Sequence, residues 1–328
     1  MLKILDWNIS YTNNAQSKIE YLDAVAGDDS FIAILQEVTP SQFAAFKEHY
    51  GSIEYSLNYR EPGKFDTKQR QLGVAIITSD DIKLTNAKVL DRCLLPDRTL
   101  MADAVVKGQT YRVMGLHSIT GVSHKKAKSM QFLSFAEEVD WYKPDIVAFD
   151  ANEPKLDHFN VENMVFFDNQ DRGHGAYTFF HELNDVGLKD SILAGYDESH
   201  YIAGEPLAIS HRIEAGDQKK RYDFVFVKDS LDVINTQYNF HDAVSAGSDH
   251  ALIRVDLNLS DNQEERSMEA RKTDPFEPVR KFQEEHPTKA SREEALRNMT
   301  NAQIDELIKA SGIVQAKIYY ASFKKKEE

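Results

Sequence analysis

The chain has 328 residues, 41% of them hydrophobic and 28% charged, which is enough apolar material for a substantial buried core. Its 53 acidic and 39 basic residues give a formal net charge of −14, which excludes a broadly basic nucleic-acid-binding surface. A single cysteine, Cys93, excludes a disulfide framework and a thiolate zinc site, and no apolar run is long enough to span a bilayer. No secretory signal precedes the first strand-like run, so we expect a cytoplasmic protein without a membrane span.

Strand-like apolar runs alternate with amphipathic helical segments over the first 260 residues. Along the chain, helices are expected at 15–26, 40–49 and 124–142, and strands at 72–78, 111–117, 145–149 and 223–227. This alternation predicts one large α/β domain over residues 1–260.

Four apolar runs end abruptly in side chains that bind metals or transfer protons. The first run ends at Asn8, the second at Glu37, another at His117, and a fourth at the pair Asp150 and Asn152. In α/β proteins the ends of neighbouring strands gather into one crevice, so residues distant in sequence converge there. We therefore expect these five side chains to share a site.

The segment Gly247-Ser248-Asp249-His250, just before the apolar run 251–255, places a carboxylate and an imidazole side by side at a strand entrance. Taken singly, such a pair also fits an ordinary turn. Together with the upstream set it indicates metal-assisted proton transfer, because oxygen ligands suit a hard cation such as Mg²⁺ and histidines then serve as acid and base.

In this order the motifs resemble the endonuclease/exonuclease/phosphatase superfamily of metal-dependent phosphoesterases, over roughly residues 1–258. The resemblance implies an α/β (α+β) four-layer sandwich, in which two central mixed β-sheets are flanked by helices. The matching residues are Asn8 in Asp-Trp-Asn-Ile, Glu37 in Leu-Gln-Glu-Val, Asp150 and Asn152 in Asp-x-Asn, Asp223 in Arg-Tyr-Asp-Phe, and Ser248-Asp249-His250.

The resemblance also implies roles for these residues. Mg²⁺ would be held chiefly by Glu37, and Mn²⁺ takes the same ligand types. The other implied metal ligands are Asn8, Asp150, Asn152 and Asp249. His250, oriented by Asp223, would activate water, while His117 would protonate the leaving oxygen or stabilise developing charge. The implied catalytic set is His117, Asp150, Asn152, Asp223, Asp249 and His250, and Arg98 is expected to face the substrate phosphate.

The segment Leu116-His117-Ser118 resembles the deoxyribonuclease I branch and favours a nuclease, an endonuclease acting on DNA in preference to RNA. A second hypothesis is a phosphatase or phospholipase-like hydrolase of a small or lipid phosphoester, which the acidic composition favours. An inactive binding scaffold is the third and least favoured, because no member of the site is missing. Phe149 and Ala151 depart from the superfamily's Gly-Asp-Phe-Asn pattern without removing a polar side chain.

Nucleic-acid binding by this acidic chain would need local basic patches. Residues 262–328 contain 13 basic and 13 acidic side chains, so the whole excess of negative charge belongs to residues 1–261. Each candidate patch also fits an ordinary solvated surface. The candidates are Arg60, Lys64, Lys68 and Arg70 in one loop, the segment 124–128, and the segment 219–221.

The C-terminal part differs in kind. Residues 261–290 contain Pro275, Pro278 and Pro287 and are expected to form a linker with a short helix. Residues 291–328 are expected to form a helical extension, because 291–294 and 300–303 have capping-box form and Gly312 would end a helix. The extension either packs on the catalytic domain or a protein partner, or binds nucleic acid.

Overall fold

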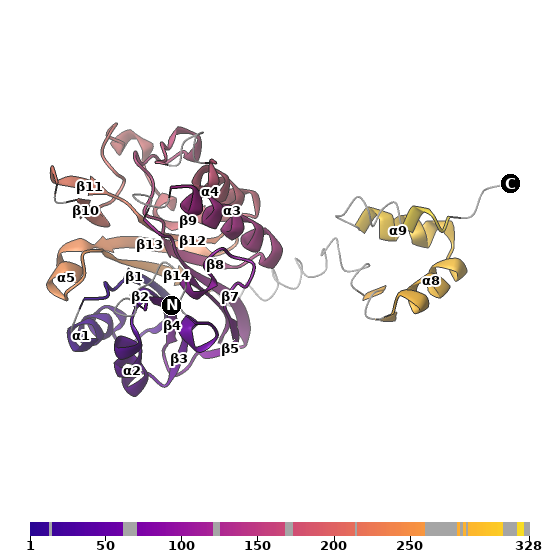
Figure 1. Ribbon diagram of the computed structural model, residues 1–328, viewed down its shortest axis with the longest axis horizontal. Helices are drawn as coiled ribbons and strands as arrows, with labels where there is room; N and C mark the ends of the chain where they lie inside the picture. The colour runs from indigo at the N-terminus through magenta and orange to yellow at the C-terminus, as the bar shows by residue number, and fades with distance from the viewer. Residues whose placement is uncertain are drawn as a thin grey trace. The chain divides into compact units, whose positions relative to one another are not determined.

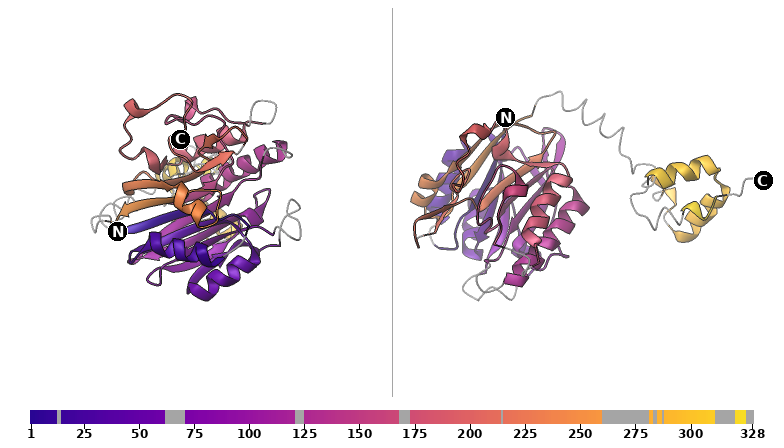
Figure 2. Two further views of the ribbon diagram at one scale, coloured as in Figure 1. Left: turned by 90° about the vertical axis from the view of Figure 1, so that its left-hand side faces the viewer. Right: turned by 90° about the horizontal axis from the view of Figure 1, so that it is seen from above.

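The computed structural model describes residues 1–12, 15–61, 71–120, 125–167, 173–213, 215–259, 281–282, 285–286, 288–310 and 320–324. The chain divides into two compact units, Met1–Leu259 and Ser260–Glu328 (Figures 1 and 2). Within the described residues, every helix is too short or too polar to cross a membrane. All the site residues predicted from the sequence lie in the first unit.

The first sheet has the strand order β13-β14-β1-β2-β4-β3. Its strands β1 and β2 are parallel and all other neighbours are antiparallel, which makes the sheet mixed. Its strands are β1 (Leu2–Asn8), β2 (Ser30–Val38), β3 (Ser52–Tyr55), β4 (Gly73–Thr78), β13 (Asp232–Asn239) and β14 (Leu252–Asn258).

The second sheet has the order β5-β6-β7-β8-β12-β9 and is also mixed, because only β7 and β8 are parallel. Its strands are β5 (Lys83–Lys88), β6 (Thr99–Val106), β7 (Gln109–His117), β8 (Ile146–Asp150), β9 (Leu188–Asp190) and β12 (Asp223–Lys228). A separate small ribbon pairs β10 (His211–Ile213) with β11 (Gln218–Lys220).

Side-chain alternation explains how the layers stack. In β1, Leu2 and Ile4 point into the core between the two sheets, whereas Leu5 and Trp7 point to the outer, helix-covered face. Helices α1 (Ala15–Ala26) and α2 (Pro40–His49) cover the first sheet, and α3 (Lys125–Tyr142) and α4 (Gly175–Asp185) cover the second (Figure 1). The predicted four-layer sandwich is confirmed, with two mixed sheets between two helical layers.

The predicted helices and strands of this unit agree with the observed ones to within one residue at each end, apart from the strand expected at 111–117, because β7 begins two residues earlier, at Gln109. Proline at the first position and a capping box between Thr39 and Gln42 start α2. The remaining helical segments of this unit are short: η1 (Ser56–Asn58), η2 (Pro96–Arg98), η3 (Val161–Asn163), η4 (Ser191–Leu193), η5 (Glu198–His200) and α5 (Phe240–Ser245).

The second unit contains helices α8 (Lys289–Asn298) and α9 (Asn301–Ala310). They share a small core of Phe282, Leu296, Ile304, Leu307 and Tyr320. The predicted cap between Thr300 and Gln303 is confirmed. The cap predicted at 291–294 is wrong: the box joins Thr288 to Ser291, because Thr288 has the extended backbone of an N-cap and α8 begins earlier. Most of the expected linker, including 261–280, and Gly312 lie outside the described residues.

Candidate metal and catalytic site

Three predicted site residues lie in one row across the second sheet. His117 ends β7 and is the parallel partner of Asp150, which ends β8. Asp150 is in turn the antiparallel partner of Asp223, which begins β12. Because these positions are in register, three side chains that are spread over more than 100 positions of the sequence reach one end of the sheet.

The first sheet contributes Asn8 and Glu37 to the same place. Asn8 ends β1, and its Nδ2 donates to Asp150 Oδ2 at 2.9 Å, so the two sheets are joined by a hydrogen bond at the site. Glu37 has a left-handed backbone (φ 58°) where the pairing of β2 with β4 shifts register. Such a bulge redirects a side chain, and the Glu37 carboxylate accepts from the backbone N–H of Tyr11 at 3.2 Å.

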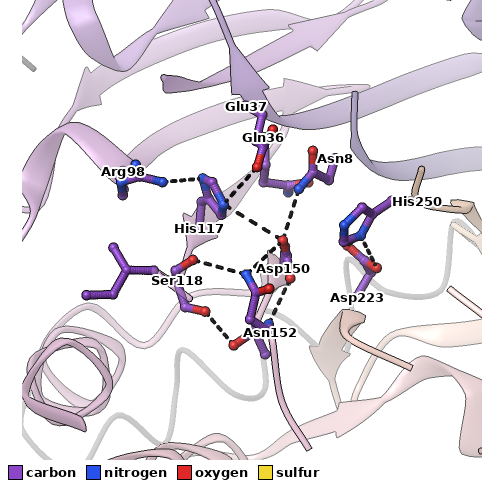
Figure 3. A network of polar contacts seen from close by, with 12 residues as sticks. Asn8, Gln36, Glu37, Arg98, His117, Ser118, Asp150, Asn152, Asp223 and His250 are labelled. Carbon is purple, nitrogen blue, oxygen red and sulfur yellow. Dashed lines mark hydrogen bonds and ion pairs between the residues drawn. The ribbon is translucent and has the colours of Figure 1, made fainter. Parts of the chain in front are cut away.

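Glu37, His117 and Asp150 meet around one point (Figure 3). His117 Nε2 lies 3.6 Å from Glu37 Oε1 and 3.8 Å from Asp150 Oδ2. Two carboxylates from different sheets thus face one imidazole nitrogen at the convergence of the strand ends.

Asn152 is fixed by its neighbours. Its backbone N–H donates to Asp150 Oδ1 at 2.8 Å, and its side-chain Nδ2 donates to Asp150 Oδ2 and to the Ser118 carbonyl, both at 3.2 Å. The buried Lys128 ammonium donates to the Asn152 carbonyl at 2.6 Å and pairs with the buried Glu153 carboxylate at 3.1 Å. The turn after β8 is therefore held from both its backbone and its side chains.

His250 and Asp223 form a buried pair. His250 Nδ1 lies 2.8 Å from Asp223 Oδ2 and 3.0 Å from Oδ1. The His250 backbone is held on both sides, because its carbonyl accepts from Trp7 Nε1 and its N–H donates to Ser248 Oγ. Burial by itself lowers the pKa of His250, but the charges of Asp223 and Asp150 outweigh it and raise this pKa to about 10.

Arg98 contacts His117. Its Nη1 lies 2.9 Å from His117 Nδ1, and a guanidinium only donates, so Nδ1 accepts and the proton of the neutral ring is on Nε2. Burial first, then the charges of Arg98 and His250, hold the pKa of His117 well below its usual value. His117 is therefore neutral, and its Nε2–H lies on the side of Glu37 and Asp150. The contact of Arg98 with a substrate phosphate remains a prediction.

Buried acidic groups crowd the site. Burial, followed by the charge of Asp223, raises the pKa of Asp150 to about 7 and raises that of Asp6 well above its ordinary value. Asp6 Oδ2 accepts no hydrogen bond from the residues that the structure describes. A divalent cation fits this arrangement, since it would offset the excess negative charge with the oxygen ligands that Asp150, Glu37 and the nearby amides supply.

Asp249 is exposed, unlike the other predicted residues of the site. One of its carboxylate oxygens lies within 4.8 Å of ring nitrogens of His211 and His250, and a second such group joins Asp150, Asp223 and His250. Both groups are compatible with a bound metal ion. The first includes His211, which the sequence did not single out.

Two basic side chains from the candidate nucleic-acid-binding patches are buried in the structure. Arg221 is fully buried, with Nη1 2.7 Å from Asp190 and Nε 2.9 Å from Asp157, so it cannot contact nucleic acid. Lys128, in the segment 124–128, is buried against Glu153. Most of the loop patch, Lys64 to Arg70, lies outside the described residues, as does His124.

Sequence reasoning also missed Asp6 and Gln36. Gln36 Nε2 donates to Asp6 Oδ1 at 2.6 Å. Asp6 lies in β1 with Asn8, and Gln36 lies in β2 with Glu37. Strand alternation carries a signal for Asp6, because it is two residues before Asn8 and shares its inward face. Nothing in the sequence pattern points to His211 or to Lys128 as neighbours of the site.

Known proteins resemble this chain in structure but not in sequence. No protein-family model matches the chain, and no curated protein matches it by sequence. By structure, the first unit has the sandwich fold that the sequence resemblance implied, and it shares this fold with several solved structures.

Particular solved structures give the extent of the likeness. The human Nocturnin catalytic domain with bound sulfate is 13% identical, with a TM-score of 0.55 over 79% of this chain and 94% of that one. The 3′ phosphatase NExo from Neisseria, bound to a product DNA hairpin, is 17% identical, with a TM-score of 0.54 over 79% and 100%. TDP2 from D. rerio with a single-strand DNA product is 17% identical, with a TM-score of 0.53 over 78% and 98%. At these identities the likeness establishes the fold.

Proposed function

We propose that the chain is a divalent-metal-dependent phosphoric ester hydrolase, and specifically a Mg²⁺-dependent nuclease that cuts DNA phosphodiester bonds internally. The observation that carries the proposal is the meeting of Glu37 and Asp150, from different sheets, beside the His250–Asp223 pair and the neutral His117. Metal ligands, a base and a hydrogen-bond donor are thus brought together where a phosphate could bind.

The metal would be held by Glu37 and Asp150 with the amides of Asn8 and Asn152, and Asp249 would support this shell. When bound, Mg²⁺ supplies charge stabilisation for the phosphoryl oxygens, and Mn²⁺ suits the same ligands. His250 would take a proton from the attacking water at Nε2, while Asp223 holds its Nδ1–H.

The protonation state of His250 depends on whether a metal ion occupies the site. Without metal, a pKa of about 10 keeps its ring protonated at neutral pH, and a protonated ring accepts no proton. A cation held beside Asp150 would offset part of the carboxylate charge that raises this pKa. We therefore expect His250 to act as a base only when the metal site is filled.

His117 would act as a donor to the phosphate and not as a titrating acid. The Arg98 guanidinium on Nδ1 leaves Nε2–H pointing at Glu37 and Asp150, where a phosphoryl oxygen would lie. Of the two roles implied by the sequence resemblance, this geometry favours stabilising the developing charge.

DNA is the favoured substrate class because TDP2 and NExo, which share the fold, were solved with DNA products. A small-molecule or lipid phosphoester is the second candidate, favoured by the net charge of −14. The cytoplasmic location and a nucleic-acid or protein partner for residues 291–328 remain predictions.

The function is tested by replacing His250 and Asp150. His250→Ala and Asp150→Asn should each lower hydrolysis by about 10²–10⁴-fold, because a positioned base and a metal ligand are lost. His241→Ala, an exposed histidine on α5, is the matched control and should retain full activity. Turnover is measured with Mg²⁺ on plasmid, single-stranded DNA, RNA, a phosphoinositide headgroup and a small diester. Full activity of His250→Ala on every substrate cut by the parent protein would contradict the assignment, and cleavage of a monoester only would replace the nuclease by a phosphatase.

A further inference from the structure

His211 begins β10 and lies against His250, although 39 positions separate the two residues in the sequence. An isolated antiparallel bridge pairs their backbones. Their ring centroids are 4.5 Å apart with an interplanar angle of 34°, and the His211 ring also stacks on Tyr222 at 5.7 Å. Its position is therefore fixed by both its backbone and its ring, beside the site but outside the residues assigned to hydrolysis.

Both imidazoles present the same nitrogen to a ligand. His211 Nδ1 lies 3.0 Å from the Asp249 carbonyl, which only accepts, so this nitrogen carries the proton. His250 Nδ1 is bound in the same way to the Asp223 carboxylate at 2.8 Å. Histidines that bind metals commonly hold their other ring N–H on a carbonyl or carboxylate in this way, which orients Nε2 for coordination.

Asp249 completes a three-ligand set. One of its carboxylate oxygens and one ring nitrogen each of His211 and His250 lie within 4.8 Å of one another. Two imidazoles and one carboxylate suit Zn²⁺ and related transition ions, whereas Mg²⁺ prefers oxygen ligands such as those of Glu37 and Asp150. Asp249 is exposed and His211 half-buried, so an ion can enter from solvent.

We propose that His211, Asp249 and His250 form a second, transition-metal site that binds Zn²⁺-class ions next to the magnesium site. A metal on His250 Nε2 occupies the lone pair that would accept the proton of water. Zn²⁺ is therefore an inhibitor at saturating Mg²⁺. The binding is independent of the proposed hydrolase function, whereas the inhibition rests on it.

Binding is tested with Co²⁺, whose visible absorption reports coordination by protein ligands. The full chain is titrated with CoCl₂ in excess Mg²⁺, which fills the oxygen site. We expect one equivalent to bind and His211→Asn to weaken that binding by about 10-fold or more. Glu37→Gln, which changes the magnesium ligands only, should bind Co²⁺ like the parent protein. Equal Co²⁺ binding by His211→Asn and the parent protein, or no absorption in either, would overturn the proposal.

Two further measurements separate the site from a folding defect and from the proposed function. His211→Asn should melt at the parent temperature in chelator, and Asp249→Asn, at an exposed position, should weaken Co²⁺ binding as well. With a hydrolysable substrate, Zn²⁺ should inhibit the parent protein and leave His211→Asn active. Equal inhibition of both proteins would refute the inhibitory role. A chain that hydrolyses none of the substrates but binds Co²⁺ through His211 would disprove the proposed function and retain the metal site.

Discussion

At the scale of single residues, Asp223 controls whether the His250 ring is protonated. The folded pKa of His250, about 10, is above the ordinary value of 6.5, although burial opposes this rise. A folded-state pKa above the unfolded one means that protonation favours the native state. The stabilisation is therefore complete below about pH 6.5 and is lost as the pH rises toward 10.

Asp223→Asn tests this linkage. Without the carboxylate, His250 has no charge partner at Nδ1, so the variant loses the stabilisation that the parent protein gains below pH 6.5. We expect the stability difference between the two proteins, measured by urea unfolding in chelator, to be largest near pH 6 and to shrink toward pH 10. Asp242→Asn on exposed α5 is the control. A difference that does not vary with pH would contradict the proposed origin of the shift.

Metal binding should be visible in stability even without a substrate. A ligand that binds only the folded state at 100 times its Kd adds about 2.7 kcal/mol. Mg²⁺ should therefore raise the melting temperature of the parent protein, and Glu37→Gln should lose most of that rise. Glu48→Gln, at an exposed position of α2, should respond like the parent protein. An undiminished Mg²⁺ response in Glu37→Gln would exclude Glu37 as a principal ligand.

At the scale of elements, the contact between α3 and α4 positions part of the site. Gly175, the first residue of α4, donates its N–H to Ser129 Oγ at 2.9 Å, and a Cβ placed on it would lie 2.0 Å from the Ser129 carbonyl oxygen. The two helices approach this closely only because the position is glycine. Next to Ser129, Lys128 holds the Asn152 carbonyl, so packing of α4 is coupled to the turn after β8.

Gly175→Ala should therefore force α3 and α4 apart. We expect a loss of about 1–3 kcal/mol in unfolding free energy, the usual cost of overpacking, and reduced hydrolysis through the displaced Asn152 turn. Ser129→Ala removes only the hydrogen bond and should cost about 1 kcal/mol. Denaturant unfolding and turnover of both variants check this, and a parent-like unfolding midpoint for Gly175→Ala would show that the helices tolerate the methyl group.

At the scale of the whole molecule, charge and chemistry are unevenly distributed. The proposed site lies entirely within the first unit, which has its own cores. Residues 262–328 have no net charge, and the second unit has a separate small core. The catalytic chemistry should therefore not require the second unit.

Deleting residues 262–328 should leave hydrolysis of a short substrate within about two-fold of the parent protein. Retention on DNA, measured at several salt concentrations, then shows whether the extension binds nucleic acid, because phosphate contacts by Lys and Arg make affinity salt-dependent. Unchanged DNA affinity and salt slope would exclude a nucleic-acid-binding role for the extension. Loss of hydrolysis would show instead that the first unit depends on it.

Much of the fold was predictable because it is encoded in local periodicity. Period-two or continuous apolar runs marked β4, β8 and β12, whose residues are buried on both faces, and helical apolar spacing marked α1 and α2. The polar strand ends Asn8, Glu37, His117 and Asp150 stood out because a buried run that stops at a hydrophilic side chain breaks that pattern. Their resemblance to a known family supplied the layer order, which periodicity does not contain.

The sequence by itself determined the element types, the four-layer class and the residues that converge. Only the tertiary structure decided their partners: Arg98 on His117, Lys128 beneath Asn152, Arg221 buried between two aspartates, and His211 beside His250. The physical reason is that these pairings depend on sheet register and on how loops pack across layers. Contacts between residues distant along the chain leave no local period in the sequence, yet they set the proton positions and charges on which the proposed chemistry depends.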